Sequence, residues 1–117
     1  MDCIFCKIIK RELPSTVVYE DDAVIVFKNI RPLAPLHYLS VPKRHIGSVI
    51  EVTEEDRDAV FAVILGAKRA AEKIGLKGYK LVFNVGKEGG QVIDHLHLHL
   101  LGGWRNLEAA SRIGDFP

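Results

Sequence analysis

The chain has 117 residues, 48% of them hydrophobic, and its 16 Lys and Arg nearly balance its 15 Asp and Glu. This length fits one domain, residues 1–117, built around a single hydrophobic core. The charges are interspersed, which argues against nucleic-acid binding because that function requires a basic surface. The sequence has neither an apolar run of membrane-spanning length nor a signal peptide, so we expect a cytoplasmic protein with reduced thiols and no membrane partner.

Cys3 and Cys6 are the only cysteines of the chain. The residues around them predict a short helix over positions 3–10, with one apolar face made of Ile4, Phe5, Ile8 and Ile9. The cysteine pair has three interpretations, namely two structural thiols, a redox pair, or half of a zinc site. A redox pair is expected after a strand of a βαβ unit, which does not precede it here. Zinc requires two further ligands, and His45 and His95 are available.

Three strands are predicted in the next part of the chain. Residues 17–20 and 23–27 are rich in β-branched side chains and flank two aspartates, which indicates a hairpin. Residues 28–35 form a loop, because their two prolines lack the N–H groups that a central strand donates. Residues 37–41 form a third strand that ends at Pro42. His37 on this strand is interpreted as a structural histidine.

The longest helix is expected between Thr53, an N-cap residue, and Gly75, which ends it. Its apolar residues recur at helical spacing and form the face that packs on a sheet: Val60, Val63, Ile64, Ala67, Ala71 and Ile74. Phe61 and Leu65 lie on a flank outside this stripe, where a surface helix does not need them. This flank predicts a contact between subunits.

A fourth strand is expected over residues 79–85, and the segment after it alternates histidine and leucine from position 95 to 101. A period of two predicts a half-buried strand with its leucines in the core and three imidazoles on the other face. Such a row suits a small anion, to which the preceding Gly89 and Gly90 can present backbone N–H groups. The alternatives are a chance histidine-rich surface and a three-histidine metal site. The metal site is disfavoured because the outer imidazoles of a straight strand are too far apart to share one ion.

The motif His95-Leu96-His97-Leu98-His99-Leu100-Leu101 resembles the His-φ-His-φ-His-φ-φ signature (φ apolar) of the histidine-triad (HIT) family of nucleotide hydrolases and transferases. The resemblance covers nearly the whole chain and includes residues 4–9, 20–22, 41–46, 84 and 89–91. Together these segments resemble the Hint branch, whose members cleave nucleoside phosphoramidates.

The resemblance implies that His97 attacks the α-phosphorus of a nucleotide and forms a nucleotidyl-histidine, which water then cleaves. Imidazole suits this role because it is nucleophilic while neutral at pH 7 and is also a good leaving group. His99 and the backbone around Gly90 and Val92 would hold the phosphoryl oxygens. His95 would orient the site, either directly or as a metal ligand.

The resemblance also implies a purine nucleotide as the small-molecule partner. In the family, the positions of Phe27 and Ile30 pack on the purine, and an acidic residue at the position of Asn29 holds the ribose hydroxyls. The residue type of Asn84 alone indicates a turn. By resemblance, Asn84 corresponds to a substrate-binding amide. The nucleotide contacts expected by resemblance are Ile4, Phe5, Ile8, Phe27, Asn29, Ile30, Asn84, Gly90, Gln91, Val92, His97 and His99.

Several HIT proteins with the N-terminal Cys-x-x-Cys carry a Cys2His2 zinc site. The resemblance therefore implies one structural zinc ion held by Cys3, Cys6, His45 and His95, with no cofactor required for catalysis. Four protein ligands close the tetrahedral shell and leave no position for substrate.

Strands, a long helix and more strands joined by tight turns predict an α+β domain with a five-stranded, mainly antiparallel sheet, one long helix and a short N-terminal helix. The resemblance adds a HIT-like fold, a homodimer, and hydrolysis of nucleoside 5′-phosphoramidates or adenylated compounds. Val92 stands where Hint-like proteins usually carry a small hydroxyl residue. Diadenosine polyphosphate hydrolysis is therefore one alternative, and a non-catalytic nucleotide-binding or interaction module is the other.

Overall fold

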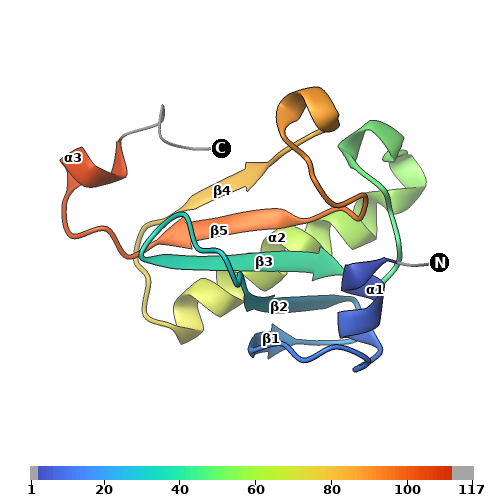
Figure 1. Cartoon of the computed structure of the whole chain (residues 1–117), viewed down its shortest axis with the longest axis horizontal. Coiled ribbons are helices and arrows are strands. Elements are labelled where there is room, and N and C mark those ends of the chain that lie inside the picture. The colour runs from blue at the N-terminus through green and yellow to red at the C-terminus, as the bar shows by residue number, and fades with distance from the viewer. Residues whose placement is uncertain (1–2, 112–117) are drawn as a thin grey trace.

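The computed structural model describes residues 3–111, which form one five-stranded sheet with helices on both faces (Figure 1). The helices are α1 (Ile4–Ile9), α2 (Arg57–Lys73) and α3 (Leu107–Ala110), and the strands are β1 (Val17–Glu20), β2 (Val24–Lys28), β3 (Leu36–Pro42), β4 (Lys80–Phe83) and β5 (Leu98–Gly102). Single 3-10 turns are η1 (Val49–Glu51), η2 (Glu54–Asp56) and η3 (Lys87–Gly89). None of the helices in this described part of the chain is long and apolar enough to cross a membrane.

The strands follow the order β1-β2-β3-β5-β4, and each neighbouring pair is antiparallel. β1 and β2 form the predicted hairpin. β5 comes last in the sequence but lies between β3 and β4, so β4 is an edge strand. The predicted α+β fold with a five-stranded antiparallel sheet is therefore confirmed.

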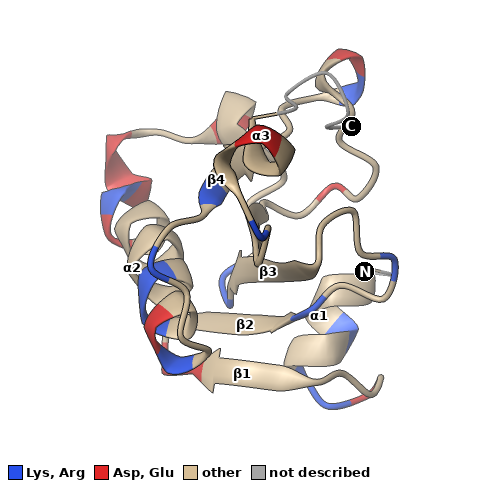
Figure 2. Ribbon diagram, turned by 90° about the vertical axis from the view of Figure 1, so that its left-hand side faces the viewer, with Lys and Arg blue, Asp and Glu red and all other residues tan. Residues whose placement is uncertain are grey.

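The alternation of side chains along β2 and β3 divides the core into two parts, one on each face of the sheet. On one face, residues such as Val26 and Tyr38 pack against Ala70 and Ala71 of α2. On the other face, residues 25, 27, 39 and 41 pack against α1. Figure 2 shows α2 and α1 on opposite sides of the strands, with both signs of charge along α2. The face that carries α1 also carries the histidines.

The predicted long helix forms, although it begins later than the cap residue indicated. Thr53 caps the 3-10 turn η2, and its N–H donates to Oδ2 of Asp56 over 2.9 Å. The α-helical part starts at Arg57 and ends before Gly75, whose positive φ of 81° suits glycine. Gly66 allows α2 to lie close to the sheet, because an added Cβ would stand only 2.8 Å from Cγ1 of Val24.

The histidine segment is not a strand over its whole length, which corrects the prediction. β5 begins at Leu98, so His95 and His97 precede the strand. In the register of β3 and β5, Ser40 pairs with Leu98, so a longer strand would place His97 opposite Val41 and Leu96 opposite Pro42. Proline has no N–H to donate, and the N–H of Leu96 donates instead to the carbonyl of Ile46 over 2.6 Å.

Because the histidine segment joins the sheet only at Leu98, β4 is also shorter than predicted. Val82 pairs with His99 and Phe83 with Leu98, so the next residue, Asn84, would pair with His97, which has left the sheet. The strand therefore ends at Phe83 rather than at Val85 as predicted. The side chain of Asn84 projects from the end of the strand instead of from its middle.

Candidate functional site

The three histidines of the motif belong to two neighbouring groups rather than to one row. The rings of His97 and His99 have centroids 5.1 Å apart, and His37 from β3 lies at the same distance from His99. His95 turns toward His45 instead, with 4.6 Å between ring centroids. All three motif histidines are buried, so the prediction of a half-buried strand is wrong.

His97 is oriented by the backbone beside it. Its Nδ1 donates a hydrogen bond of 2.7 Å to the carbonyl oxygen of His95. In the neutral ring this leaves the lone pair on Nε2. The ring of Phe5 packs edge-on against His97 at 5.2 Å and further limits its rotation.

His99 is oriented through His37. The backbone N–H of Leu33 donates to Nδ1 of His37 over 3.0 Å, which places the proton of a neutral His37 on Nε2. That Nε2–H donates to Nδ1 of His99 over 2.9 Å. The ring proton of neutral His99 is then on Nε2, so His99 presents a donor where His97 presents a lone pair.

Burial keeps these imidazoles neutral at pH 7. Loss of solvation, assisted by the nearby His97, lowers the pKa of His37, His95 and His99 to about 4. Loss of solvation also lowers the pKa of His97, against the opposing effect of its hydrogen bond to the carbonyl of His95. A neutral imidazole is the form that can act as a nucleophile.

Asn84 and the glycine loop (residues 86–92) lie beside His99. The side-chain amide of Asn84 contacts the ring of His99, with 3.5 Å between Nδ2 and Nε2. Gly90 has a positive φ of 87°, and a Cβ on it would stand 3.9 Å from Nδ2 of Asn84. The ring of His99, the side-chain amide of Asn84 and the backbone of the glycine loop therefore lie close together.

The other predicted nucleotide contacts are spread over different environments. Ile30 is 93% exposed and Val92 is 90% exposed, whereas Phe27 is buried and packs edge-on against Phe5. Oδ1 of Asn29 accepts the backbone N–H of Arg31 over 2.9 Å, so its acceptor already serves the local turn. Of the two remaining residues on α1, Ile4 is partly exposed and Ile8 is buried.

The predicted metal ligands come together at the start of α1. The ligand atoms of Cys3, Cys6, His45 and His95 all lie within 4.8 Å of one another. Nδ1 of His95 is 3.3 Å from Sγ of Cys3 and 3.6 Å from Sγ of Cys6, and Nδ1 of His45 is 3.4 Å from Sγ of Cys6. Around a tetrahedral zinc ion, neighbouring ligand atoms stand about 3.3–3.8 Å apart, so this donor set fits one.

The protonation of the cluster also suits a cation. Nε2 of His95 donates to the carbonyl oxygen of Pro42 over 2.9 Å, which leaves Nδ1 as the lone-pair atom that faces the cysteines. Burial and the neighbouring Cys3 raise the pKa of the Cys6 thiol in the metal-free chain. A bound cation would oppose this by stabilising the thiolate.

Comparison with known proteins identifies the family. The family model for the "Scavenger mRNA decapping enzyme C-term binding" domain matches residues 2–111. The purine nucleoside phosphoramidase of Escherichia coli is 44% identical over 104 residues, which cover 87% of this chain and 87% of that protein. The chain belongs to the histidine-triad family. A HIT family hydrolase from Legionella pneumophila has a TM-score of 0.85 at 46% identity, over 89% of this chain and 95% of that one.

A second HIT structure bears on the cysteine and histidine cluster. A zinc-bound histidine triad family protein from Mycobacterium smegmatis has a TM-score of 0.78 at 31% identity, over 96% of this chain and 81% of that one.

His37 is the site residue whose place the sequence reasoning missed. Both of its ring nitrogens are hydrogen-bonded, as expected of a structural histidine, but one partner is His99 of the HIT motif. The contact depends on β3 and β5 being neighbours, and no local pattern in the sequence encodes that pairing. A histidine on a predicted buried strand of a chain with this motif is the only available signal.

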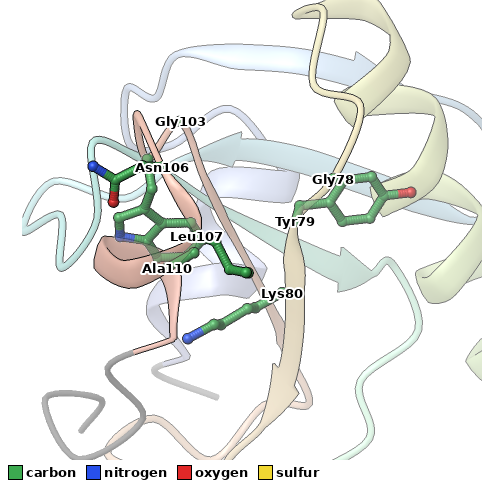
Figure 3. Close-up of a pocket in the computed structure, with 8 residues that line it drawn as sticks. Gly78, Tyr79, Lys80, Gly103, Asn106, Leu107 and Ala110 are labelled. Carbon is green, nitrogen blue, oxygen red and sulfur yellow. The ribbon is translucent and has the colours of Figure 1, made fainter.

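A pocket elsewhere in the molecule holds none of the histidines. It lies between the start of β4 and the segment from Gly103 to Ala110 (Figure 3). Nζ of Lys80 stands 5.1 Å from the centroid of the Trp104 ring beside it. Trp104 thus docks the C-terminal segment on β4, apart from the HIT site.

Proposed function

We propose that this chain hydrolyses nucleoside 5′-phosphoramidates or related adenylated compounds through a nucleotidyl-histidine on His97. The observation that carries the proposal is the hydrogen bond from Nδ1 of His97 to the carbonyl of His95, which leaves Nε2 as a neutral nucleophile. The similarity to the purine nucleoside phosphoramidase of Escherichia coli supports a purine nucleotide substrate.

In the first step, Nε2 of His97 attacks the α-phosphorus and the bond from phosphorus to the leaving nitrogen breaks. The leaving nitrogen takes up a proton and departs as an amine. In the second step, water attacks the same phosphorus, its proton is released, and the P–N bond to His97 breaks to give the nucleoside monophosphate. Nε2–H of His99, the amide of Asn84 and the backbone around Gly90 and Val92 would hold the phosphoryl oxygens as charge develops on them.

The purine and ribose would lie along the loop after β2. Ile30 offers an exposed apolar surface to a purine, whereas Phe27 is buried and would support Phe5 and the floor of the site. Oδ1 of Asn29 accepts the N–H of Arg31, and its Nδ2 lies 3.3 Å from Nε2 of His37, so a ribose hydroxyl would compete with these two contacts.

The direct test is turnover of adenosine 5′-phosphoramidate with phosphorus NMR detection of the released monophosphate. Rapid acid-free denaturation during turnover should trap an adenylyl group on the peptide that contains His97. Asp94→Asn, on an exposed neighbour in the same segment, is the matched control and should retain activity. No turnover by the wild-type chain, with nucleotide still bound, would favour the non-catalytic module instead.

Diadenosine polyphosphates are a second candidate substrate class because of the exposed Val92. Its isopropyl group is 90% exposed and offers no hydroxyl to a phosphoramidate leaving group. The two substrates should be compared in one assay by kcat/KM. A higher value for diadenosine polyphosphate would reverse the stated preference while leaving the role of His97 unchanged.

We further propose that Cys3, Cys6, His45 and His95 hold one structural zinc ion. When bound, the ion would tie the start of α1 to His95, next to the nucleophile. Elemental analysis of protein purified without chelator or metal-affinity tag should give one zinc per chain, and Cys6→Ser should lose it. Chelation should lower the melting temperature more than the rate per folded molecule. Zinc that stays substoichiometric after addition under reducing conditions would contradict the site.

We also propose a homodimer that covers the α2 flank and the edge of β4. Phe61 is 62% exposed and Leu81 on the edge strand is 39% exposed, and a dimer would cover these apolar side chains and the unpaired strand edge. Sedimentation equilibrium should give a dimer at micromolar concentration. Phe61→Asp should weaken it, whereas Leu13→Asp, at an exposed apolar residue away from this flank, should not. A wild-type monomer would contradict the proposal.

A further inference from the structure

We infer that Gln91 is a positioning residue, whose side-chain amide holds the glycine loop (residues 86–92) in the shape that binds a phosphoryl group. The inference rests on the proposed function, because it concerns the same phosphoryl site. It gives Gln91 a supporting role in place of the direct nucleotide contact expected by resemblance.

The side-chain amide of Gln91 joins three separate backbone positions. Its Oε1 accepts the N–H of Gly86 over 3.0 Å. Its Nε2 donates to the carbonyl oxygens of Gly47 over 2.8 Å and Ile93 over 2.9 Å. Both amide protons and the oxygen are therefore engaged, and the residue is only 5% exposed. A buried amide with these three bonds is poorly placed to contact a nucleotide itself.

Besides the side chain of Gln91, backbone hydrogen bonds shape the glycine loop: the N–H of Gly89 donates to the carbonyl of Gly86 over 3.1 Å, and the N–H of Gly90 donates to the carbonyl of Lys87 over 3.0 Å. Residues 87–90 are all exposed, so no apolar side chain among them packs into a core. Two of the loop residues, Gly86 and Gly90, have positive φ values of 69° and 87°, where glycine loses much conformational entropy on ordering. Besides the side chain, the backbone N–H of Gln91 donates to the carbonyl of Gly86 over 3.0 Å. Gln91 thus joins the end of the loop to its start at Gly86 through both its backbone and its side chain.

The bond to Gly47 fixes the loop relative to the rest of the site. Gly47 lies in the buried segment after β3, and Ile46 in the same segment accepts the N–H of Leu96 over 2.6 Å. The histidine segment and the glycine loop are thereby attached to one common support. The backbone of Gly90 consequently keeps its distance from Asn84 and His99, and phosphoryl transfer depends on donors held in this way.

The test compares two variants with a control of matched chemistry. Gln91→Met keeps the length of the side chain and removes all three bonds, and Gln91→Glu keeps the acceptor for Gly86 while losing both donors. Ser40→Ala is the control, because Oγ of Ser40 makes a buried hydrogen bond of 2.7 Å to the carbonyl of Val63 on the α2 face. All three variants remove buried side-chain to backbone bonds, but only the first two alter the loop.

The readouts separate positioning from stability. For Gln91→Met we expect kcat to fall about 100-fold with a smaller change in KM, as for misplaced oxyanion donors. Calorimetric affinity for AMP should fall about tenfold while affinity for adenosine, which lacks the phosphate, changes less than about twofold. Gln91→Glu should show the same pattern, and Ser40→Ala should leave kcat, KM and both affinities unchanged.

Each other outcome overturns the inference. Equal losses of AMP and adenosine affinity would make Gln91 a general stabilising residue, and an unchanged kcat in either variant would remove its role in positioning. If both variants fail to fold, hydrogen exchange of the Gly86 amide in the wild-type chain tests the inference instead. Unprotected exchange would show that the hydrogen bond from Gly86 to Oε1 of Gln91 does not form. A wild-type chain that binds AMP without turnover would refute the proposed hydrolysis alone, because the binding comparison still tests Gln91.

Discussion

Both faces of the sheet are buried, but they are built from different kinds of residue. The α2 face joins apolar side chains such as Val24 and Leu98 to the small residues of the helix, with the hydroxyl of Ser40 buried among them. The α1 face buries four imidazoles and a thiol among its apolar residues: His37, His95, His97, His99 and Cys3. Burial on the α2 face therefore serves stability, whereas burial on the α1 face also sets the protonation state of the reactive imidazoles.

The burial of so many polar groups is tolerated because each has a partner. Within residues 3–111, no buried side-chain nitrogen or oxygen lacks a hydrogen bond. On the α1 face, backbone carbonyls are partners of His95 and His97. Such bonds offset the loss of solvation and also fix which ring nitrogen carries the proton. The following predictions test whether the two faces are separable in function.

The largest effect is expected from His97→Ala on the α1 face. Turnover should be abolished, while nucleotide affinity stays within about tenfold, because a nucleophile acts mainly in the transition state. Single-turnover kinetics with adenosine 5′-phosphoramidate and calorimetry with AMP measure the two quantities. Near wild-type turnover by this variant would show that His97 is not the nucleophile. The proposed chemical difference between the α1 and α2 faces would then be lost.

The stability of the α1 face should depend on pH. The pKa values of His37 and His99 fall from 6.5 to about 4 on folding, so the unfolded chain takes up protons first as the solution is acidified. Their neutral, folded contribution is complete above pH 6.5 and is lost toward about pH 4. The free energy of unfolding should fall in this window by up to about 1.4 kcal/mol per pH unit for each proton.

Urea unfolding at several pH values, followed by circular dichroism, measures this slope. His37→Gln removes one of the titrating groups and should give a shallower slope between pH 6.5 and about 4. An unchanged slope in this variant would show that the acid sensitivity arises elsewhere in the molecule.

The smallest effect is expected on the α2 face, from Gly66→Ala. The new Cβ would stand 2.8 Å from Cγ1 of the fully buried Val24, so the helix must shift. Overpacking costs about 1–3 kcal/mol, and the better helix propensity of alanine offsets up to about 1 kcal/mol of that. Thermal unfolding should show a net loss of about 1 kcal/mol with kcat per folded molecule unchanged. Gly78→Ala is the control, since a Cβ there meets nothing within 4 Å.

The α2 face could be predicted from sequence because its signals are local. Helical spacing identified α2 and its buried residues Val63, Ala67 and Ala71, although Ile64 of the same predicted stripe is 42% exposed. The β-branched runs identified β1 and β2. The start of α2 was placed at the Thr53 cap, but a 3-10 turn intervenes. A cap marks where helical turns begin, and it does not distinguish the 3-10 from the α-helical kind.

The α1 face was predicted only in part. The motif identified His97 and His99, and the structure brings Asn84 and Gly90 to them. The turn of His95 away from the row was not predicted, because it depends on Pro42, a residue of a different strand that cannot continue the ladder. The contact of His37 with His99 spans 62 positions of sequence and exists only because β5 inserts beside β3. Periodicity reports the faces of an element and carries no information on its neighbours.

The position of β5 in the sheet has a consequence for synthesis of the chain. The strand is the last to leave the ribosome, yet it lies between β3 and β4 rather than at an edge. A nascent chain that ends before residue 98 therefore lacks the strand that joins β4 to β3, and its polar α1 face is without His99. Long-range pairing of this kind closes late in folding. Every molecule that has an assembled histidine site has thus also inserted β5 into its sheet.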